Sequence, residues 1–257
     1  MNYIGIDIGS TCAKTVVLNE KKELILEFVQ PTGWSSVDTA EEIRQKLEFA
    51  GINLSNESSH CVATGYGRIS VPYADKTVTE ITCHALGAVH LFQHPDLTVI
   101  DIGGQDTKII QIEQGFVKDF IMNDKCAAGT GRFLEVMANT LSLRPNEMFD
   151  LARLGSDTTI SSMCTVFAES EVIGLIGKGE PKENIAYAVV DSTIRKVTAQ
   201  LSRMNGEMST FCLTGGLCEC EYIREALSKK LGKEVISSPD ARYAGAIGAA
   251  LSAMKIR

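Results

Sequence analysis

The chain has 257 residues, of which 44% are hydrophobic and 22% charged, a balance typical of a globular protein with enough apolar material for a core. Its net charge of −7 argues against a dedicated nucleic-acid-binding protein, which usually carries a basic stripe. We see no run of about 18 uncharged apolar residues and no basic segment leading into an apolar one, so we expect neither a membrane span nor a signal peptide. The expected location is the cytoplasm, where the eight cysteines would be reduced.

The first predicted element is a hairpin that turns on glycine and small polar residues. Strand-forming residues lie within 3–18 and 24–29, and the first of these ranges contains the turn sequence Asp7-Ile8-Gly9. Glycine lets backbone N–H groups approach an anion closely, and a carboxylate can hold a magnesium ion through water. A helix at 36–50, a strand at 61–64 and a helix at 79–93 follow, and the alternation of strands and helices predicts an α/β fold.

The same design returns 94 residues later. Ile6-Asp7-Ile8-Gly9 recurs as Ile100-Asp101-Ile102-Gly103, and Lys14 recurs as Lys108. Either turn alone is typical of an ordinary hairpin. The matched pair instead predicts a clamp for nucleotide phosphates, formed by two hairpins that face each other.

The remaining elements are mostly helical. We expect helices at 125–141, 145–154, 164–177, 182–204, 219–231 and 243–254, and strands at 210–214 and 235–236. The strand at 210–214 ends at Gly215-Gly216, which either faces an adenosine or forms a normal strand-to-helix turn. The predicted domains are 1–95, 96–240 and a terminal helix at 241–257 that packs back on the first domain.

Two cysteines precede predicted helices. Cys126 follows Asp124-Lys125, and Cys164 follows a polar run that begins at Ser161. The positive end of a helix dipole favours a thiolate, so the pair could hold an anionic metal cluster. The residues alone leave a second possibility open, in which one cysteine is buried and the other incidental. Since two ligands do not complete a four-thiolate site, a cluster would require a twofold dimer.

These motifs, with the segments 123–133 and 164–171, closely resemble the activator (component A) of 2-hydroxyacyl-CoA dehydratases, a family that also includes ATPase subunits of benzoyl-CoA reductases. The resemblance covers essentially the whole chain. It implies an actin-like (ribonuclease H-like) ATPase fold with two duplicated domains and ATP in the cleft between them. It also implies a homodimer with one oxygen-sensitive [4Fe–4S] cluster, held by Cys126 and Cys164 of each subunit. A ferredoxin or flavodoxin would donate the electron, and an iron–sulfur dehydratase or reductase would accept it.

Site roles follow from this resemblance. Asp7 and Asp101 are expected to organise Mg²⁺ and its waters, and Gln105 to position the attacking water. The residues expected to contact the nucleotide are Ser10, Thr11, Cys12, Ala13, Lys14, Gly103, Gly104, Gln105, Gly215, Gly216 and Arg242.

Two alternatives keep the fold and drop the cluster. One is a small-molecule kinase in which Asp106 would act as the catalytic acid, and the other is a regulatory nucleotide-binding protein. Neither gives the cysteine segments a purpose. Iron content separates the activator from both alternatives, and substrate-dependent ATP consumption separates the two alternatives from each other.

Overall fold

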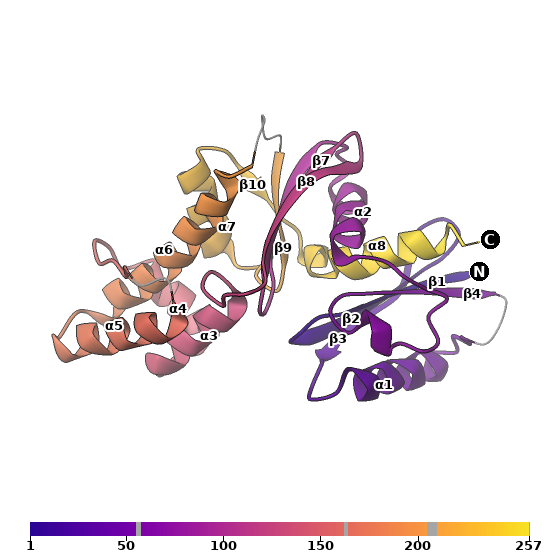
Figure 1. The fold of residues 1–257 in the computed structure, drawn as a ribbon, viewed down its shortest axis with the longest axis horizontal. Coiled ribbons are helices and arrows are strands. Elements are labelled where there is room, and N and C mark those ends of the chain that lie inside the picture. Colours follow the sequence, from indigo (N-terminus) through magenta and orange to yellow (C-terminus); the bar gives the residue numbers. More distant parts are fainter. Residues whose placement is uncertain (55–57, 162–163, 205–209, 257) are drawn as a thin grey trace. The chain divides into compact units, whose positions relative to one another are not determined.

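The computed structural model describes residues 1–54, 58–161, 164–204 and 210–256, and it forms two compact units. Unit 1 comprises Met1–Leu97, Ile112–Lys118 and Asp240–Arg257, and unit 2 comprises Thr98–Gln111 and Asp119–Pro239. Figure 1 shows that each unit combines strands and helices. Across the described residues, no helix has the length and apolar character needed to cross a bilayer.

Unit 1 is built on a five-stranded sheet with the order β3-β2-β1-β4-β5. β1 pairs antiparallel with β2 and parallel with β4. The strands are β1 (Asn2–Ile8), β2 (Cys12–Leu18), β3 (Leu24–Pro31), β4 (Ser59–Thr64) and β5 (Lys76–Thr77). Alternate residues of β1 face opposite sides of the sheet, so one sequence supplies two packing surfaces.

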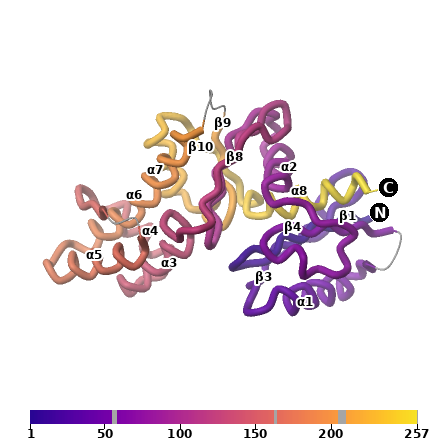
Figure 2. The backbone as a smooth tube through the Cα atoms, viewed as in Figure 1, coloured from indigo at the N-terminus to yellow at the C-terminus, as the bar shows by residue number. Residues whose placement is uncertain are grey.

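Helices cover both faces of this sheet. The isoleucines of β1 pack with Ile43 and Leu47 of α1 (Ser36–Phe49), while Val16 of β2 packs with α8 (Ala244–Ala253) on the other face. α8 also lies along α2 (Glu80–Phe92), and the tube in Figure 2 shows α8 in yellow beside β1. Gly5 permits this close approach, because a Cβ there would lie 1.9 Å from the Ala246 carbonyl oxygen. Short 3₁₀ turns occupy Arg68–Ser70 and Pro239–Tyr243.

Unit 2 contains a second five-stranded sheet, with the order β10-β9-β6-β7-β8. Its strands are β6 (Leu97–Ile102), β7 (Thr107–Glu113), β8 (Phe116–Asn123), β9 (Thr210–Gly215) and β10 (Val235–Ile236). Its helices are α3 (Gly131–Thr140), α4 (Pro145–Ala152), α5 (Thr165–Gly177), α6 (Lys182–Leu201) and α7 (Glu221–Leu231). One apolar core joins one face of β6 to all five helices.

The two sheets share one topology. In each sheet the first strand lies between the second and the fourth, and the third and fifth strands form the edges. The repeat extends beyond the hairpins, since β4 ends at Thr64 and is followed by Gly65, while β9 ends with Thr214-Gly215. Both glycines have positive φ, +83° and +84°, and a Cβ on either would lie within 2.7 Å of the first-strand aspartate. The 94-residue repeat is therefore part of a structural duplication.

The predicted helix starting at residue 125 was wrong in its first turn. Residues 124–130 form a loop, and α3 begins at Gly131 after the extended N-cap residue Thr130. Gly129 has a φ of +84°, which right-handed helices do not accommodate. Gly129 therefore lies before α3 and Gly131 is its first residue, so neither is a destabilising glycine in a helix interior.

Candidate functional site

The turn between β1 and β2 presents small polar residues beside a buried acid. The Gly9 amide donates to the Cys12 carbonyl at 3.1 Å, and the Thr32 hydroxyl donates to the Gly9 carbonyl at 2.7 Å, which fixes the turn. Ser10 and Thr11 at the tip are exposed. Backbone N–H groups in such a turn are suited to bind an anion.

Asp7 is buried at the base of this turn, with 3% of its surface exposed. It lies directly across the β1–β2 ladder from Lys14. Its Oδ1 atom has no hydrogen-bond partner among the described residues. A buried carboxylate oxygen without a partner is costly, so this atom fits a role in holding a hydrated cation.

The equivalent acid in unit 2 has protein partners on both oxygens. The Thr214 hydroxyl donates to Asp101 Oδ1 at 2.9 Å, and Lys108 Nζ lies 3.3 Å from Asp101 Oδ2. The same ammonium group lies 2.8 Å from Asp106 Oδ1, although the lysine is only 1% exposed. A buried lysine requires such partners, because desolvation of an uncompensated charge costs several kcal/mol.

The two copies of the motif therefore share a backbone design and differ in electrostatics. Asp7 Oδ1 has no hydrogen-bond partner among the described residues, whereas both oxygens of Asp101 interact with Lys108 or Thr214. Of the residues around these two acids, Lys14 was predicted to be a site residue, whereas Lys108 and Thr214 were not. The repeat itself carried the signal for Lys108, which occupies the position of Lys14 in the second copy.

The tip of the unit 2 turn is tightly closed. The Gly103 amide donates to the Asp106 carbonyl at 2.9 Å, and a Cβ on Gly103 would lie 2.3 Å from Asp106 Oδ1. Gln105 is exposed at this tip. Gly104 beside it accepts a hydrogen bond from the Arg132 amide at 2.8 Å, so the turn is attached to the start of α3.

The residues assigned to adenosine are divided between the units. Gly215 is the last residue of β9 in unit 2, and Gly216 follows it. Gly216 is open, with no atom within 4 Å of a Cβ built on it. Arg242 belongs to unit 1 and lies in the 3₁₀ turn before α8. Their role in adenosine binding stays a prediction.

The two cysteines of interest belong to unit 2 and differ from the packed cysteines. Cys126 is half-buried in the loop before α3, and Cys164 is exposed as the N-cap residue of α5. Residues 162 and 163, which precede Cys164, lie outside the described residues. By contrast, burial raises the pKa of Cys83 to about 12 and raises the pKa of Cys212 strongly, so these thiols are inert packing groups.

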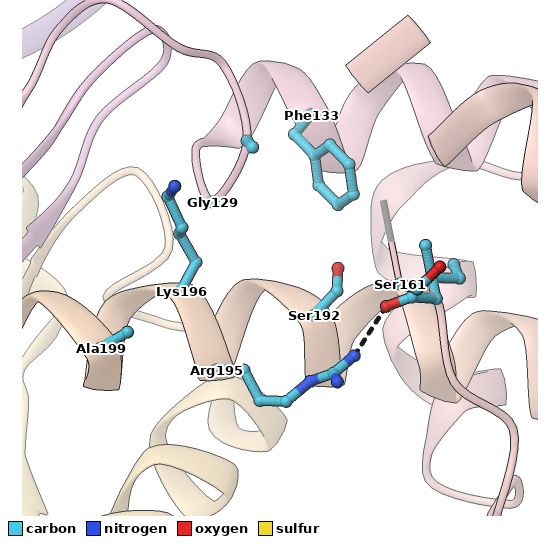
Figure 3. A pocket seen from close by; sticks show the side chains of 9 residues that line it. Gly129, Phe133, Ser161, Ser192, Arg195, Lys196 and Ala199 are labelled. Atoms are coloured by element: carbon cyan, nitrogen blue, oxygen red, sulfur yellow. Dashed lines mark hydrogen bonds between the residues drawn. The ribbon is translucent and has the colours of Figure 1, made fainter. Parts of the chain in front are cut away.

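Both cysteine segments pack against adjacent residues of α6 (Figure 3). Arg195 donates from Nη2 to the Ile160 carbonyl at 2.9 Å, four residues before Cys164. Lys196 packs its aliphatic stem on Gly129, three residues after Cys126, and a Cβ on Gly129 would lie 2.8 Å from Lys196 Cγ. The space between the segments is a pocket of about 260 Å³. Its lining residues are Ala128, Gly129, Phe133, Ile160, Ser161, Ser192, Arg195, Lys196 and Ala199.

One chain does not offer a complete metal centre within its described residues, which contain no group of three or more His, Cys, Asp or Glu side chains arranged to hold a metal ion. Among the described residues, Cys126 and Cys164 therefore amount to two ligands of a four-thiolate site.

Known proteins resemble this chain over nearly its whole length. The (R)-2-hydroxyglutaryl-CoA dehydratase activating ATPase of Acidaminococcus fermentans is 44% identical over 257 residues, which cover 98% of this chain and 96% of that protein. The crystal structure of component A of the A. fermentans dehydratase superposes with a TM-score of 0.90 at 42% identity, covering 99% of this chain and 98% of that one. The activator of 2-hydroxyisocaproyl-CoA dehydratase from Clostridium difficile, solved with bound ADPNP, gives a TM-score of 0.88 at 34% identity, covering 99% of this chain and 95% of that one.

These matches confirm the predicted resemblance and the actin-like ATPase fold. The family model described as the BadF/BadG/BcrA/BcrD ATPase family matches residues 4–253. The chain is therefore an ATPase that belongs to the BadF/BadG/BcrA/BcrD family.

Proposed function

We propose that this ATPase activates a partner 2-hydroxyacyl-CoA dehydratase, or a related iron–sulfur reductase, by delivering one low-potential electron at the expense of ATP. The names of its relatives support the activator role. The observation that carries the electron-transfer part is the pair Cys126 and Cys164, on two segments that pack against adjacent residues of α6. A ferredoxin or flavodoxin is the proposed donor.

The two acid–glycine turns are the proposed phosphate-binding elements. Ser10 and Thr11 offer exposed hydroxyl groups, and Cys12, Ala13, Gly103 and Gly104 offer backbone contacts to phosphate oxygens. Lys14 contributes a positive charge beside Asp7. Gln105, exposed at the tip of its turn, positions the attacking water without acting as a strong base.

The described residues fit a magnesium ion at Asp7 better than at Asp101. The unpartnered Asp7 Oδ1 can accept hydrogen bonds from water bound to the ion. Asp101 instead holds Lys108 in place, and Lys108 holds Asp106. In this assignment Asp7 orients the hydrated ion, while Asp101 keeps the second turn rigid.

The cysteines fit half of a four-thiolate site. Cys164 lies at the N-terminus of α5, where the helix dipole favours a negatively charged ligand. Two copies related by a twofold axis would contribute four thiolates from Cys126 and Cys164. A [4Fe–4S] cluster, when bound, stores and releases one electron. In this chain Asn123 and Arg195 donate the hydrogen bonds that position the segments of the two cysteine ligands.

The surface beside Cys164 supports a homodimer. Val166 and Phe167, in the first turn of α5, are each 67% exposed, and Ile173 is 56% exposed on the same helix. Large apolar side chains gathered on one exposed helix mark an association surface. A second copy covering this surface would bring its own cysteines near Cys164.

The test is the iron and acid-labile sulfide content of anaerobically purified protein. We expect about four of each per dimer in the wild type, and their loss in Cys126→Ser. Cys220→Ser is the matched control, because Cys220 is also half-buried, also precedes a helix of unit 2, and has no assigned role.

Absence of iron from the wild type would refute the electron-transfer proposal. In that case, ATP consumption that depends on an added small-molecule substrate would favour the kinase alternative. ATP consumption without such dependence would favour the regulatory one.

A further inference from the structure

The segment that carries Cys126, residues 124–130, is held in place by side-chain hydrogen bonds to its carbonyl groups. Four successive carbonyl oxygens each accept a hydrogen bond from a side chain. Asn123 Nδ2 donates to the Cys126 and Ala128 oxygens at 2.8 and 3.3 Å. Thr130 Oγ1 donates to the Ala127 oxygen at 2.6 Å. A loop held at consecutive positions moves as one body.

The fourth carbonyl is held from a different part of the unit. Thr107 Oγ1 donates to the Gly129 oxygen at 2.7 Å in a buried contact that links residues 22 positions apart. Thr107 is the first residue of β7 and follows the turn that contains Gly104 and Gln105. Its side chain is 1% exposed, so water does not compete for this hydrogen bond.

Two backbone hydrogen bonds reinforce this connection. The Gly131 amide donates to the Gly103 oxygen at 2.9 Å, and the Arg132 amide donates to the Gly104 oxygen at 2.8 Å. Two backbone hydrogen bonds thus join the turn to the start of α3, and the Thr107 hydroxyl joins the strand after the turn to Gly129 in the Cys126 segment. Displacement of residues 103–107 therefore acts directly on Gly129.

Gly129 also borders a space that leaves room for movement. Lys196 touches Gly129 through its flexible stem, and the pocket of about 260 Å³ opens beside Gly129 and Phe133 (Figure 3). The pocket gives this part of the backbone space into which it can shift.

We propose that Thr107 is a positioning residue that transmits nucleotide occupancy of the turn at 103–106 to the Cys126 segment. The inference rests on the proposed function, because it requires that this turn contacts the nucleotide. The Thr107 hydroxyl moves with the turn and carries the Gly129 carbonyl with it. The fastened carbonyls then pass the displacement to Cys126.

The test is amide hydrogen exchange of the full chain, with and without Mg²⁺ and a non-hydrolysable ATP analogue. In the wild type we expect the analogue to change exchange in peptides covering both 97–107 and 124–132. In Thr107→Val we expect the first change to persist and the second to fall by about fivefold, roughly the factor that one net hydrogen bond contributes to an opening equilibrium. Thr107→Ser keeps the hydroxyl and should restore the second change.

Thr98→Val is the matched control. Thr98 is fully buried on the neighbouring strand β6, and its hydroxyl has no hydrogen-bond partner among the described residues. The substitution therefore makes the same chemical change without removing the link, and both peptides should respond as in the wild type.

The possible outcomes distinguish failure of the proposed role of Thr107 from failure of the proposed function. Failure of the wild type to bind the analogue would overturn the proposed function and the inference with it. Binding with a response at 97–107 and none at 124–132 would overturn the inference alone, and this result needs no variant to fold. A full response at 124–132 in Thr107→Val would overturn it equally.

Discussion

Replacement of Lys108 by methionine tests the electrostatic difference between the two copies of the repeat. The substitution retains much of the apolar stem and removes the charge that lies between Asp101 and Asp106. Asp101 is 2% exposed, so water does not replace the lost ammonium group there, although the hydrogen bond from Thr214 remains. Asp106 is 27% exposed, so water partly replaces its lost partner.

The magnitude follows from these exposures. Removal of one partner of a buried ion pair costs about 3–5 kcal/mol, and the solvent access of Asp106 places the expected loss near 3 kcal/mol. For a chain of this size that loss lowers the midpoint of thermal unfolding by roughly 6–12 °C. Urea unfolding followed by circular dichroism measures the free energy, and a thermal scan gives the midpoint.

The repeat supplies the matched control. Lys14 occupies the equivalent position in unit 1, is partly exposed, and forms no ion pair among the described residues. We expect Lys14→Met to change the free energy of unfolding by less than about 1 kcal/mol and to weaken nucleotide binding. Equal destabilisation by both substitutions, or a loss below about 1 kcal/mol in Lys108→Met, would refute the reasoning.

Three further predictions address chemistry, backbone strain and thiol protonation. Gln105→Ala should slow ATP hydrolysis on the order of 100-fold while nucleotide affinity stays within about threefold; an equal loss in both, measured by turnover and by equilibrium binding, would contradict the role of Gln105. Gly65→Ala should destabilise unit 1 by more than about 2 kcal/mol, because its Cβ would lie 2.4 Å from the Asp7 carboxylate. Gly51→Ala, with a φ of +80° and open space around its Cβ, should lower the free energy of unfolding by only about 1 kcal/mol. Urea unfolding measures both changes. Burial raises the pKa of Cys83 to about 12, above the unfolded value of about 8.5. The contribution of the neutral Cys83 thiol to stability is therefore complete below pH ~8.5 and is lost as the pH rises toward 12. In cluster-free protein at pH 8, mass spectrometry should find the exposed Cys164 alkylated well before Cys83.

Sequence reasoning located the elements that depend on local chemistry. The repeat around Asp7 and Asp101 predicted both hairpins and both glycine turns, because alternating β-rich residues and glycine are local signals. The start of α3 was missed because Gly129 has a positive φ and its carbonyl accepts a hydrogen bond from Thr107, 22 positions earlier, and no local sequence signal reports such a contact.

Long-range polar contacts could not be read from spacing. The side chains of Asp101 and Thr214 meet across 113 positions of the chain, and no periodicity relates such positions. For the same reason, the sequence could nominate Lys14 as a phosphate ligand but could not reveal that its counterpart Lys108 is buried between two carboxylates.

The close packing of α8 on β1 and α2 has a consequence for biosynthesis. The β1 surface at Gly5 is covered by Ala246, which leaves the ribosome about 240 residues later, roughly 10–50 s at ordinary elongation rates. Until then, the face of β1 and α2 that packs against α8 lacks this partner. Unit 1 therefore completes its fold only after unit 2 has been translated, and a nascent chain stalled before residue 244 would be a natural client for chaperones.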